Sequence, residues 1–589
     1  MIDDREFRIR PGRIRSTRAQ ATRPFIAQAL AATQKAGGRV SRSGNISSGK
    51  RSRFGRGQRA SIQANRLLTG RSRIVVIKTR VVRHTARSAP LGAHLNYLRR
   101  EGVTRAANEV NNGKARMFGP EKDDMDVRAF AERCQPDRHH FRFIVSPEDA
   151  PDMADLKSYT RELMGQMEKD LGSKLDWVAV DHWNTDNPHI HVILRGRTDD
   201  GQDLVVSRDY VKEGMRARAA DLVTQELGQR TDLDINRNLG RQVEAERWTQ
   251  LDRQLVRDAG NSGIIDLAPH ADRQPDAFHA LKVGRLRALE IRGLAGQVGH
   301  SQWFIKPEAE TVLRELGERG DIIKRMHRAL TERGIERGSA SYVLAGESLD
   351  VPVIGRLVDR GLDDELRGTA YAVVDGVDGR THHIKLPHID AAGDSPSGSI
   401  VELRAWGDAE GRRRVALAVR SDLDIRAQVN ASGATWLDRQ AVAREPIALS
   451  EGGFGSEVRQ AMEERAERLV SEGLADRQGG RVVFARRLLN TLRDREVNAL
   501  GEKLATETGL PLKHAGSGEY VAGSYRQRFA LASGRFAMIE VISGDGGLGF
   551  QLVPWSPSLE KQIGRHVSGI ARDDGGVDWD FGRKRGLGL

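Results

Sequence analysis

Three histidines lie within ten residues of one another, between His182 and His191. The chain has only 16 histidines among 589 residues, and neutral imidazole is the most common protein ligand of transition metals. His189 and His191 are two residues apart in a segment rich in β-branched residues, so both project from one face of a predicted strand. The residues from 184 to 188 have turn chemistry, and the resulting hairpin returns His182 to the neighbouring strand. The spacing predicts a three-nitrogen metal site with an open coordination position.

A cluster of this spacing suits three classes of site. These are a metal-dependent nuclease acting on phosphodiesters, a metal hydrolase or oxygenase of another type, and a structural metal site or a stack of surface histidines. Asp181 and Asp186 flank the cluster as candidate carboxylates that orient the ligands. They favour a divalent metal site over surface histidines. Three imidazoles suit Zn or Mn better than Mg by intrinsic preference, although Mg is the more abundant ion.

Tyr97 is the candidate nucleophile for such a site. It is one of seven tyrosines, and it lies close to Arg99 and Arg100, whose charges favour both phosphate binding and the phenolate. Tyr159 has helical spacing to apolar neighbours, which predicts a position in the core, and Tyr210 opens a later helix. On its own, Tyr97 would be interpreted as an amphipathic surface residue. Beside the histidines it predicts a nucleophile that attacks phosphorus.

The net charge of +13 is concentrated at the N-terminus. Residues 1–73 contain 18 Lys and Arg against three acidic residues, which gives +15; the remaining 76 basic and 78 acidic residues give −2. The arm at 1–72 is rich in Gly, Ser and Arg, which predicts a largely disordered segment that binds nucleic acid through phosphates, or else a solubilising leader. A single cysteine, Cys134, suits a reducing cytosol. No apolar run approaches the roughly 20 residues that span a bilayer, so we expect a cytoplasmic protein without membrane insertion.

Alternating strands and helices must position the candidate residues. Strands are predicted at 73–83, 141–145, 175–181 and 189–194, and helices at 91–101, 152–171 and 209–228. This order predicts an α+β domain at 73–230, in which helices pack on an antiparallel sheet. We expect a helical, charged segment at 231–338, a small β-rich domain at 339–445 and a mixed helix/β domain at 446–589. No sustained internal repeat is evident.

The segment His182-x-Asn184-x-Asp186-Asn187-x-His189-Ile-His191 resembles the third motif of the conjugative relaxases, or mobilisation nucleases, which are HUH endonucleases. The helix around Tyr97 resembles their first motif, which bears the catalytic tyrosine. The segment 141–149 resembles their second motif, whose serine, here Ser146, is thought to contact DNA. The T-DNA border nuclease branch is the most similar, over about residues 73–230. The C-terminal half resembles, in its general sequence character and a few short segments, a subgroup with a large extension of unknown function.

This resemblance implies an antiparallel HUH-type sheet and a site- and strand-specific DNA transesterase. It implies that Tyr97 forms a 5′-phosphotyrosine link to single-stranded origin DNA, that His182, His189 and His191 hold a divalent ion (Mg, Mn or Zn), and that Arg99, Arg100 and Ser146 bind DNA. It also implies accessory relaxosome proteins and a type IV secretion coupling protein as partners, a bacterial cytoplasmic location, and possible export with the DNA into a recipient cell. One position departs from the family pattern, because Asn184 stands where an aspartate is usual. Asn184 and Asp186 are therefore both candidates for the proton-handling step.

Two alternatives remain open. A DNA-binding mobilisation protein with a degenerate, non-catalytic site would account for Asn184. A rolling-circle replication initiator would share the active-site type, but such proteins commonly carry a helicase with a phosphate-binding loop. The chain has no Gly-x4-Gly-Lys-Ser/Thr segment, which favours mobilisation.

Overall fold

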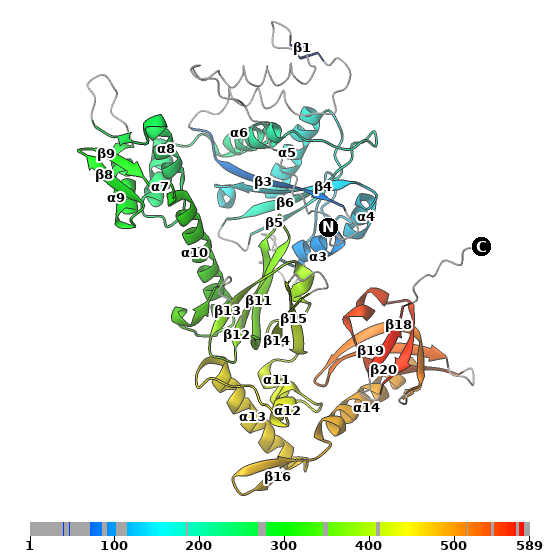
Figure 1. The fold of residues 1–589 in the computed structure, drawn as a ribbon. Coiled ribbons are helices and arrows are strands. Elements are labelled where there is room, and N and C mark those ends of the chain that lie inside the picture. Colours follow the sequence, from blue (N-terminus) through cyan, green and yellow to red (C-terminus); the bar gives the residue numbers. More distant parts are fainter. Residues whose placement is uncertain are drawn as a thin grey trace. The chain divides into compact units, whose positions relative to one another are not determined.

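The computed structural model describes residues 71–84, 91–101, 115–183, 187–268, 278–344, 352–407, 413–514, 516, 518–542, 547–572 and 576–581, with two short strands, β1 (Arg39–Val40) and β2 (Ile46–Ser47), that pair antiparallel. These residues divide into two compact units, at 1–240 and 241–589 (Figure 1). Almost all of the predicted basic arm at 1–72 lies outside the described residues. No described helix is long and apolar enough to cross a membrane.

Four antiparallel strands in the order β3-β4-β6-β5 form the sheet of the first unit. They are β3 (Val75–Arg83), β4 (His139–Pro147), β5 (Trp177–His182) and β6 (His189–Arg195). β-branched and aromatic residues recur in all four, as a pleated and half-buried surface favours. The register pairs Ile144 with His191 and His182 with His189. The predicted antiparallel sheet is confirmed, and its register fixes which residues share a face.

Helices cover both faces of this sheet (Figure 1). On one face, α5 (Leu156–Leu171) and α6 (Arg216–Leu227) share a hydrophobic core with the alternate strand residues that point toward them. On the other face lie α3 (Leu91–Glu101) and α4 (Val127–Cys134). Helix α5 begins later than the predicted start at residue 152, because the Asp155 carboxylate caps it by accepting from the N–H groups of Lys157 and Ser158. Helix α4 was not predicted.

A π-helical turn at Tyr210–Met215 leads into α6, and α7 (Asp232–Val243) follows. The second unit begins with α8 (Gln250–Ala259), β7 (Ile265–Asp266), α9 (His279–Ile291), β8 (Ala295–Gly299), β9 (Gln302–Ile305) and α10 (Ala309–Thr331). The three strands form a sheet in the order β7-β9-β8. The segment expected to be helical therefore also contains a small sheet.

A six-stranded sheet follows, in the order β10-β13-β12-β11-β14-β15. Its strands are β10 (Tyr342–Val343), β11 (Ile354–Asp364), β12 (Thr369–Gly376), β13 (Thr381–Leu386), β14 (Ile400–Gly407) and β15 (Arg413–Ser421). Next come α11 (Ile425–Asn430), α12 (Trp436–Ala441), α13 (Gly453–Ser471), the hairpin of β16 (Ala475–Gln478) and β17 (Arg481–Phe484), and α14 (Leu488–Thr508). The last sheet, β20-β19-β18-β21-β22, contains β18 (Tyr520–Leu531), β19 (Gly534–Ile542), β20 (Leu548–Pro554), β21 (His566–Ala571) and β22 (Val577–Asp580). Helical and β-rich regions thus follow the first sheet, as predicted.

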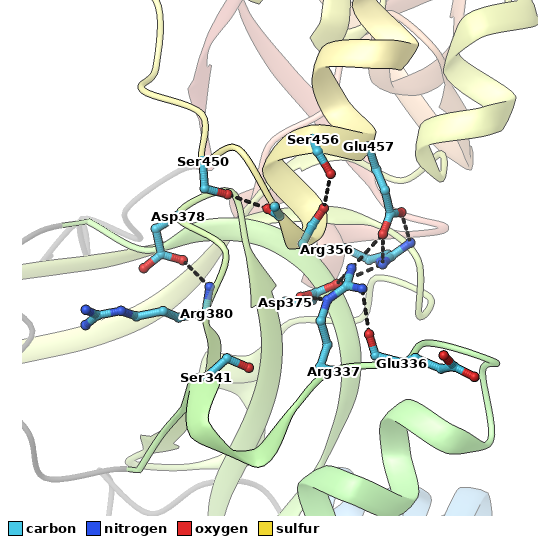
Figure 2. Close-up of polar contacts among 12 residues, drawn as sticks. Glu336, Arg337, Ser341, Arg356, Asp375, Asp378, Arg380, Ser450, Ser456 and Glu457 are labelled. Atoms are coloured by element: carbon cyan, nitrogen blue, oxygen red, sulfur yellow. Dashed lines mark hydrogen bonds and ion pairs between the residues drawn. The ribbon is translucent and has the colours of Figure 1, made fainter.

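A charge network attaches the six-stranded sheet to α13 (Figure 2). Arg337 and Arg356 both donate to the fully buried Asp375, with nitrogen–oxygen distances of 2.9 and 2.8 Å. The same two guanidinium groups also bind Glu457 of α13, at 2.6 and 3.0 Å. Two cations facing two carboxylates leave no net charge in the buried contact. This network is therefore suited to hold the six-stranded sheet and α13 together.

One arrangement of elements occurs twice in the second unit. In the first module (residues 249–331), α8 is followed by α9, the β8–β9 hairpin and α10; in the second module (residues 435–508), α12 is followed by α13, the β16–β17 hairpin and α14. Thr249-Gln-Leu-Asp-Arg-Gln254 corresponds to Thr435-Trp-Leu-Asp-Arg-Gln440, and in both segments the threonine and aspartate form a capping box. The expectation of no internal repeat is therefore wrong at the level of the fold.

A buried arginine fixes each module in the same way. Arg285 of α9 donates to both oxygens of Asp252, at 2.8 and 2.9 Å, and to the carbonyl groups of residues 243, 245 and 247. Arg465 of α13 donates to both oxygens of Asp438, at 2.9 Å each, and to the carbonyl groups of residues 429, 431 and 433. We call these two contacts the arginine locks.

Candidate metal and phosphate centre

The β5–β6 hairpin brings the three predicted ligands together. His182 ends β5 directly opposite His189, the first residue of β6, and His191 follows on the same face. The ring centroids of His182 and His191 lie 4.6 Å apart, those of His189 and His191 4.9 Å, and those of His182 and His189 5.3 Å. One ring nitrogen of each histidine lies within 4.8 Å of those of the other two. All three side chains are buried.

The donor set fits a divalent cation. His189 Nε2 and His191 Nε2 are 3.1 Å apart, and two nitrogens that bind one ion at about 2.1 Å are separated by about 3.0 Å at a right angle and about 3.4 Å at the tetrahedral angle. A proton on one of the two nitrogens makes this contact a hydrogen bond, and a bound cation would take the place of that proton. The three histidines are therefore the residues that would hold a metal here.

Backbone carbonyl groups orient two of these rings. The Asn187 carbonyl oxygen lies 2.9 Å from His189 Nδ1, so Nδ1–H donates to it and the lone pair of Nε2 is directed to His191. The Leu98 carbonyl oxygen lies 3.3 Å from His182 Nε2, and when this nitrogen donates, the lone pair is on Nδ1. Contacts of this kind fix the tautomer before a metal arrives. The second contact also joins α3 to the centre.

Tyr97 lies on α3, next to Leu98, whose carbonyl group contacts His182. Leu95 and Leu98 are fully buried and anchor the helix, whereas Tyr97 is partly exposed. The two other tyrosines of this unit are enclosed. Tyr159 donates to the Ala219 carbonyl group at 3.3 Å and Tyr210 to Asp170 at 3.1 Å, and burial raises the pKa of both phenols above the usual range. A phenol in such surroundings is a poor nucleophile, which leaves Tyr97 as the candidate in this unit.

Of the predicted DNA-binding residues, Ser146 lies in β4, and Arg99 and Arg100 lie in α3. Ser146 is two residues from Ile144, which pairs directly with His191, so Ser146 shares the histidine face of the sheet. Arg99 is half-buried, and its Nε is buried without a hydrogen-bond partner among the described residues. Arg100 lies in α3, but its side chain is not among the described groups. The structure thus brings Ser146 to the histidine face and α3 against it.

Three basic residues of this face were missed by the sequence reasoning. Lys78 pairs with Ile144, and Arg80 pairs with Arg142, so all of these residues lie on the histidine face. Lys78 and Arg80 are exposed, whereas Arg142 is 8% exposed. Burial and the nearby Arg80 lower the pKa of Arg142 to about 10. The alternation within residues 73–83 was the available signal, because it places Lys78 and Arg80 on one side of the predicted strand.

The predicted roles of Asn184, Asp186 and Asp181 have different outcomes. Asn184 and Asp186 lie outside the described residues, so their roles stay predictions. Asp181 was expected to orient the histidines, and this expectation is wrong. Strand alternation turns it to the opposite face of the sheet, where its Oδ2 accepts from Trp183 Nε1 at 2.7 Å and burial raises its pKa.

Comparison with known families gives two matches. Residues 101–226 match the relaxase family described as MobA/VirD2-like, nuclease domain. Residues 282–412 and 404–588 match the family described as protein of unknown function (DUF3363), and together they cover more than half of the chain. No curated protein and no solved structure shows significant similarity to the chain.

Proposed function

The chain belongs to the DUF3363 family and carries a MobA/VirD2-like relaxase nuclease domain that nicks DNA, and from this premise we propose that it opens one strand of origin DNA by tyrosine transesterification for conjugative transfer. We assign the reaction to residues 73–230. The observation that carries the proposal is the contact between the Leu98 carbonyl group and His182. It holds the helix of the candidate nucleophile against three converging imidazoles, which are the two groups that a metal-assisted phosphoryl transfer requires.

In the proposed reaction the Tyr97 oxygen attacks the scissile phosphorus in line. The new bond joins Tyr97 to the 5′ phosphate, and the bond from phosphorus to the 3′ oxygen breaks, which releases a 3′ hydroxyl group. The phenol proton passes to the Asp186 carboxylate as the new bond forms, and a proton returns to the leaving 3′ oxygen. Asp186 lies between His182 and His189 in the sequence, whereas Asn184 can only orient groups by hydrogen bonding. A divalent ion (Mg, Mn or Zn) on His182, His189 and His191 would neutralise charge on the non-bridging oxygens.

Exposed cations support an approach of single-stranded DNA along the outer strand β3. Lys78 and Arg80 project from the histidine face, and neither forms an ion pair with any described residue. Arg142 adds a third, desolvated positive charge opposite Arg80. Like charges directly opposite each other on neighbouring strands are unfavourable, and a phosphate group between them would relieve the repulsion. We therefore propose that the backbone crosses Lys78 and Arg80 before it reaches the histidines.

The partners follow from the same proposal. They are single-stranded origin DNA, accessory relaxosome proteins and a type IV secretion coupling protein, in a bacterial cytoplasm from which the protein can travel with the DNA into a recipient cell. Arg99, Arg100 and Ser146 are proposed to hold the strand near the cleavage site, because Ser146 shares the face of His191 and Arg99 lies two residues from Tyr97.

A covalent-adduct assay tests the reaction. The full chain is incubated with Mn²⁺ and single-stranded oligonucleotides from its origin region, and the protein–DNA adduct is separated on a denaturing gel. We expect Tyr97→Phe to abolish the adduct, because the nucleophilic oxygen is removed. Tyr520→Phe is the matched control, since Tyr520 is 68% exposed and lies in the second unit. An undiminished adduct in Tyr97→Phe would refute the assignment.

A further inference from the structure

A cavity of about 380 Å³ lies in the second unit, between α12, the start of α14 and the turn that joins β18 to β19. This volume falls within the roughly 300–1,000 Å³ that is typical of small-molecule sites. Three arginines line it, namely Arg439, Arg493 and Arg535, together with the polar Asn490 and Ser533. The cavity lies within the DUF3363 match, to which no activity is attached.

The positive charge in this cavity is only partly balanced. Arg535 is neutralised by Asp422, at 2.6 and 2.7 Å, and by Asp394, at 2.7 Å. Arg439 donates one hydrogen bond, to the Ser533 carbonyl group at 2.6 Å, and has no carboxylate within ion-pair distance among the described residues. Burial is the main cause that lowers the pKa of Arg439, and the nearby carboxylates of Asp438 and Glu496 offset it only in part.

Arg493 adds a second charge with little compensation. Its Nε lies 3.3 Å from Asp494, the next residue along the chain, whose side chain is 63% exposed. Pairs of this kind contribute little. The nearby carboxylate of Glu496 is occupied by two backbone N–H groups, those of Ala532 at 2.8 Å and Ser533 at 2.9 Å. Among the described residues, Arg439 and Arg493 thus line the cavity without a buried ion pair of their own.

The start of α14 borders the same space. Leu489 and Asn490 belong to its first turn and line the cavity. The residue before the helix, Arg487, provides no side-chain cap. The first N–H groups of a helix point outward from its positive end and favour an anion. The apolar Phe536 and Pro554 line the same cavity and offer a surface to a flat group attached to that anion.

In the first module, the two arginines that correspond to Arg439 and Arg493 have different surroundings. Arg253 and Arg314 occupy the positions that correspond to Arg439 and Arg493, but Arg314 is neutralised by Glu310 at 2.6 Å and its side chain is 58% exposed. In the second module the β18–β19 turn closes over the arginines, and its Ser533 hydroxyl group accepts from the Ala434 N–H at 2.9 Å. Gly534 has a φ of 125°, which only glycine adopts readily.

We propose that this cavity binds a phosphate-bearing ligand of nucleotide size, with the phosphate on Arg439, Arg493 and the first turn of α14 and the flat group against Phe536 and Pro554. The inference does not depend on the proposed nicking reaction. The ligand chemistry is shared by a free nucleotide and by the terminal nucleotide of a DNA strand. Both sources present a terminal phosphate that bidentate arginines recognise.

Calorimetric titration of the full chain tests this site. The probes are a nucleoside monophosphate and a short single-stranded oligonucleotide with a 5′ phosphate. Each is titrated in a buffer with a chelator, which keeps the histidine centre free of metal. We expect Arg493→Gln and Arg439→Gln to weaken binding of the recognised probe at least about tenfold. Arg253→Gln is the matched control in the first module and is expected to bind as the unaltered chain does. Binding of the monophosphate identifies a free nucleotide as the source, and arginine-dependent binding of the oligonucleotide alone identifies a DNA end.

Two results would overturn the proposal. One is the absence of measurable binding of both probes at millimolar concentration, and the other is unchanged affinity in both arginine variants. Arg439→Gln removes a hydrogen bond to the turn, so thermal unfolding is measured in parallel, and Arg493→Gln decides the question if Arg439→Gln does not fold. Adduct formation by Tyr97 is expected to be unchanged in both variants, which separates failure of this site from failure of the nuclease.

Discussion

The histidine centre of the first unit and the arginine locks of the second unit bury polar groups in opposite ways. In each lock, a cation meets a carboxylate and three carbonyl groups, so every charge faces its complement. In the centre, like groups meet: imidazole nitrogens face one another at 3.1 Å, and Arg80 stands opposite Arg142. Complementary pairing stabilises the fold on its own. Like groups held together by the surrounding fold make a site that is completed by a ligand of opposite character.

Breaking a lock tests the structural half of this comparison and has the largest expected effect. Asp438→Ala leaves the guanidinium group of Arg465 buried without its anion, and we expect a loss of about 3–5 kcal/mol in the free energy of unfolding of the second module. Urea denaturation followed by tryptophan fluorescence measures it, since Trp436 is buried in that module. Asp252→Ala should have an effect of the same size in the first module. Glu310→Ala removes only an exposed pair and should cost less than about 1 kcal/mol. Equal, small effects for all three would show that the locks are not structural.

The histidine centre should show the reverse behaviour. Without metal, His189→Ala removes one hydrogen bond within the cluster, so we expect a loss of only about 1 kcal/mol in the free energy of unfolding. A cation at roughly 100 times its Kd should stabilise the unaltered chain by about 2.7 kcal/mol, and His189→Ala should lose most of this gain. Thermal unfolding with and without Mn²⁺ or Zn²⁺ measures it. His300→Ala, an exposed histidine of the second unit, serves as the control. Metal stabilisation that survives in His189→Ala would remove this residue from the ligand set.

A third buried cluster, formed by Arg142, His140 and His84, predicts that the stability of the first unit depends on pH. Arg142 Nε donates to His140 Nε2 at 3.1 Å, so His140 carries its hydrogen on Nδ1 and donates to His84 Nε2 at 2.7 Å. Burial is the main cause that lowers the pKa of His140 to about 2. Between this value and the usual value of about 6.5, the unfolded chain binds a proton that the folded chain does not, so stability falls as the pH decreases below 6.5. We expect the loss to reach about 2 kcal/mol at pH 5, as measured by urea denaturation. His140→Gln should flatten the profile; an unchanged profile would mean that other groups cause it.

The sequence was sufficient for features that depend on local patterns. Alternation and turn residues predicted the sheet of the first unit, and the hairpin spacing predicted the convergence of His182, His189 and His191. Alternation along β5 also places Asp181 and His182 on opposite faces of the sheet, so proximity in the chain does not bring Asp181 to the histidines. The repeat in the second unit has one contiguous signal, the segments Thr249–Gln254 and Thr435–Gln440, and such a short segment does not by itself define a repeated module. In the sequence, Arg285 and Arg465 resemble other helix arginines. Only tertiary packing brings each of them against the aspartate of a capping box.

The smallest effect concerns the exposed cations of β3, which separate binding of the DNA strand from chemistry at the centre. Each phosphate contact that is lost should reduce the slope of log affinity against log salt by about 0.7 for single-stranded DNA. We therefore expect Lys78→Ala and Arg80→Ala each to weaken oligonucleotide binding severalfold at low salt, with a shallower slope and an unchanged adduct yield at saturating DNA. Lys174→Ala is the control, because Lys174 is exposed and already paired with Glu168 at 3.1 Å. A salt slope that stays the same in both β3 variants would mean that the strand approaches the histidines by another route. The β3 cations would then be solvent-exposed charges with no more role in the reaction than the exposed Arg314–Glu310 pair of the first module.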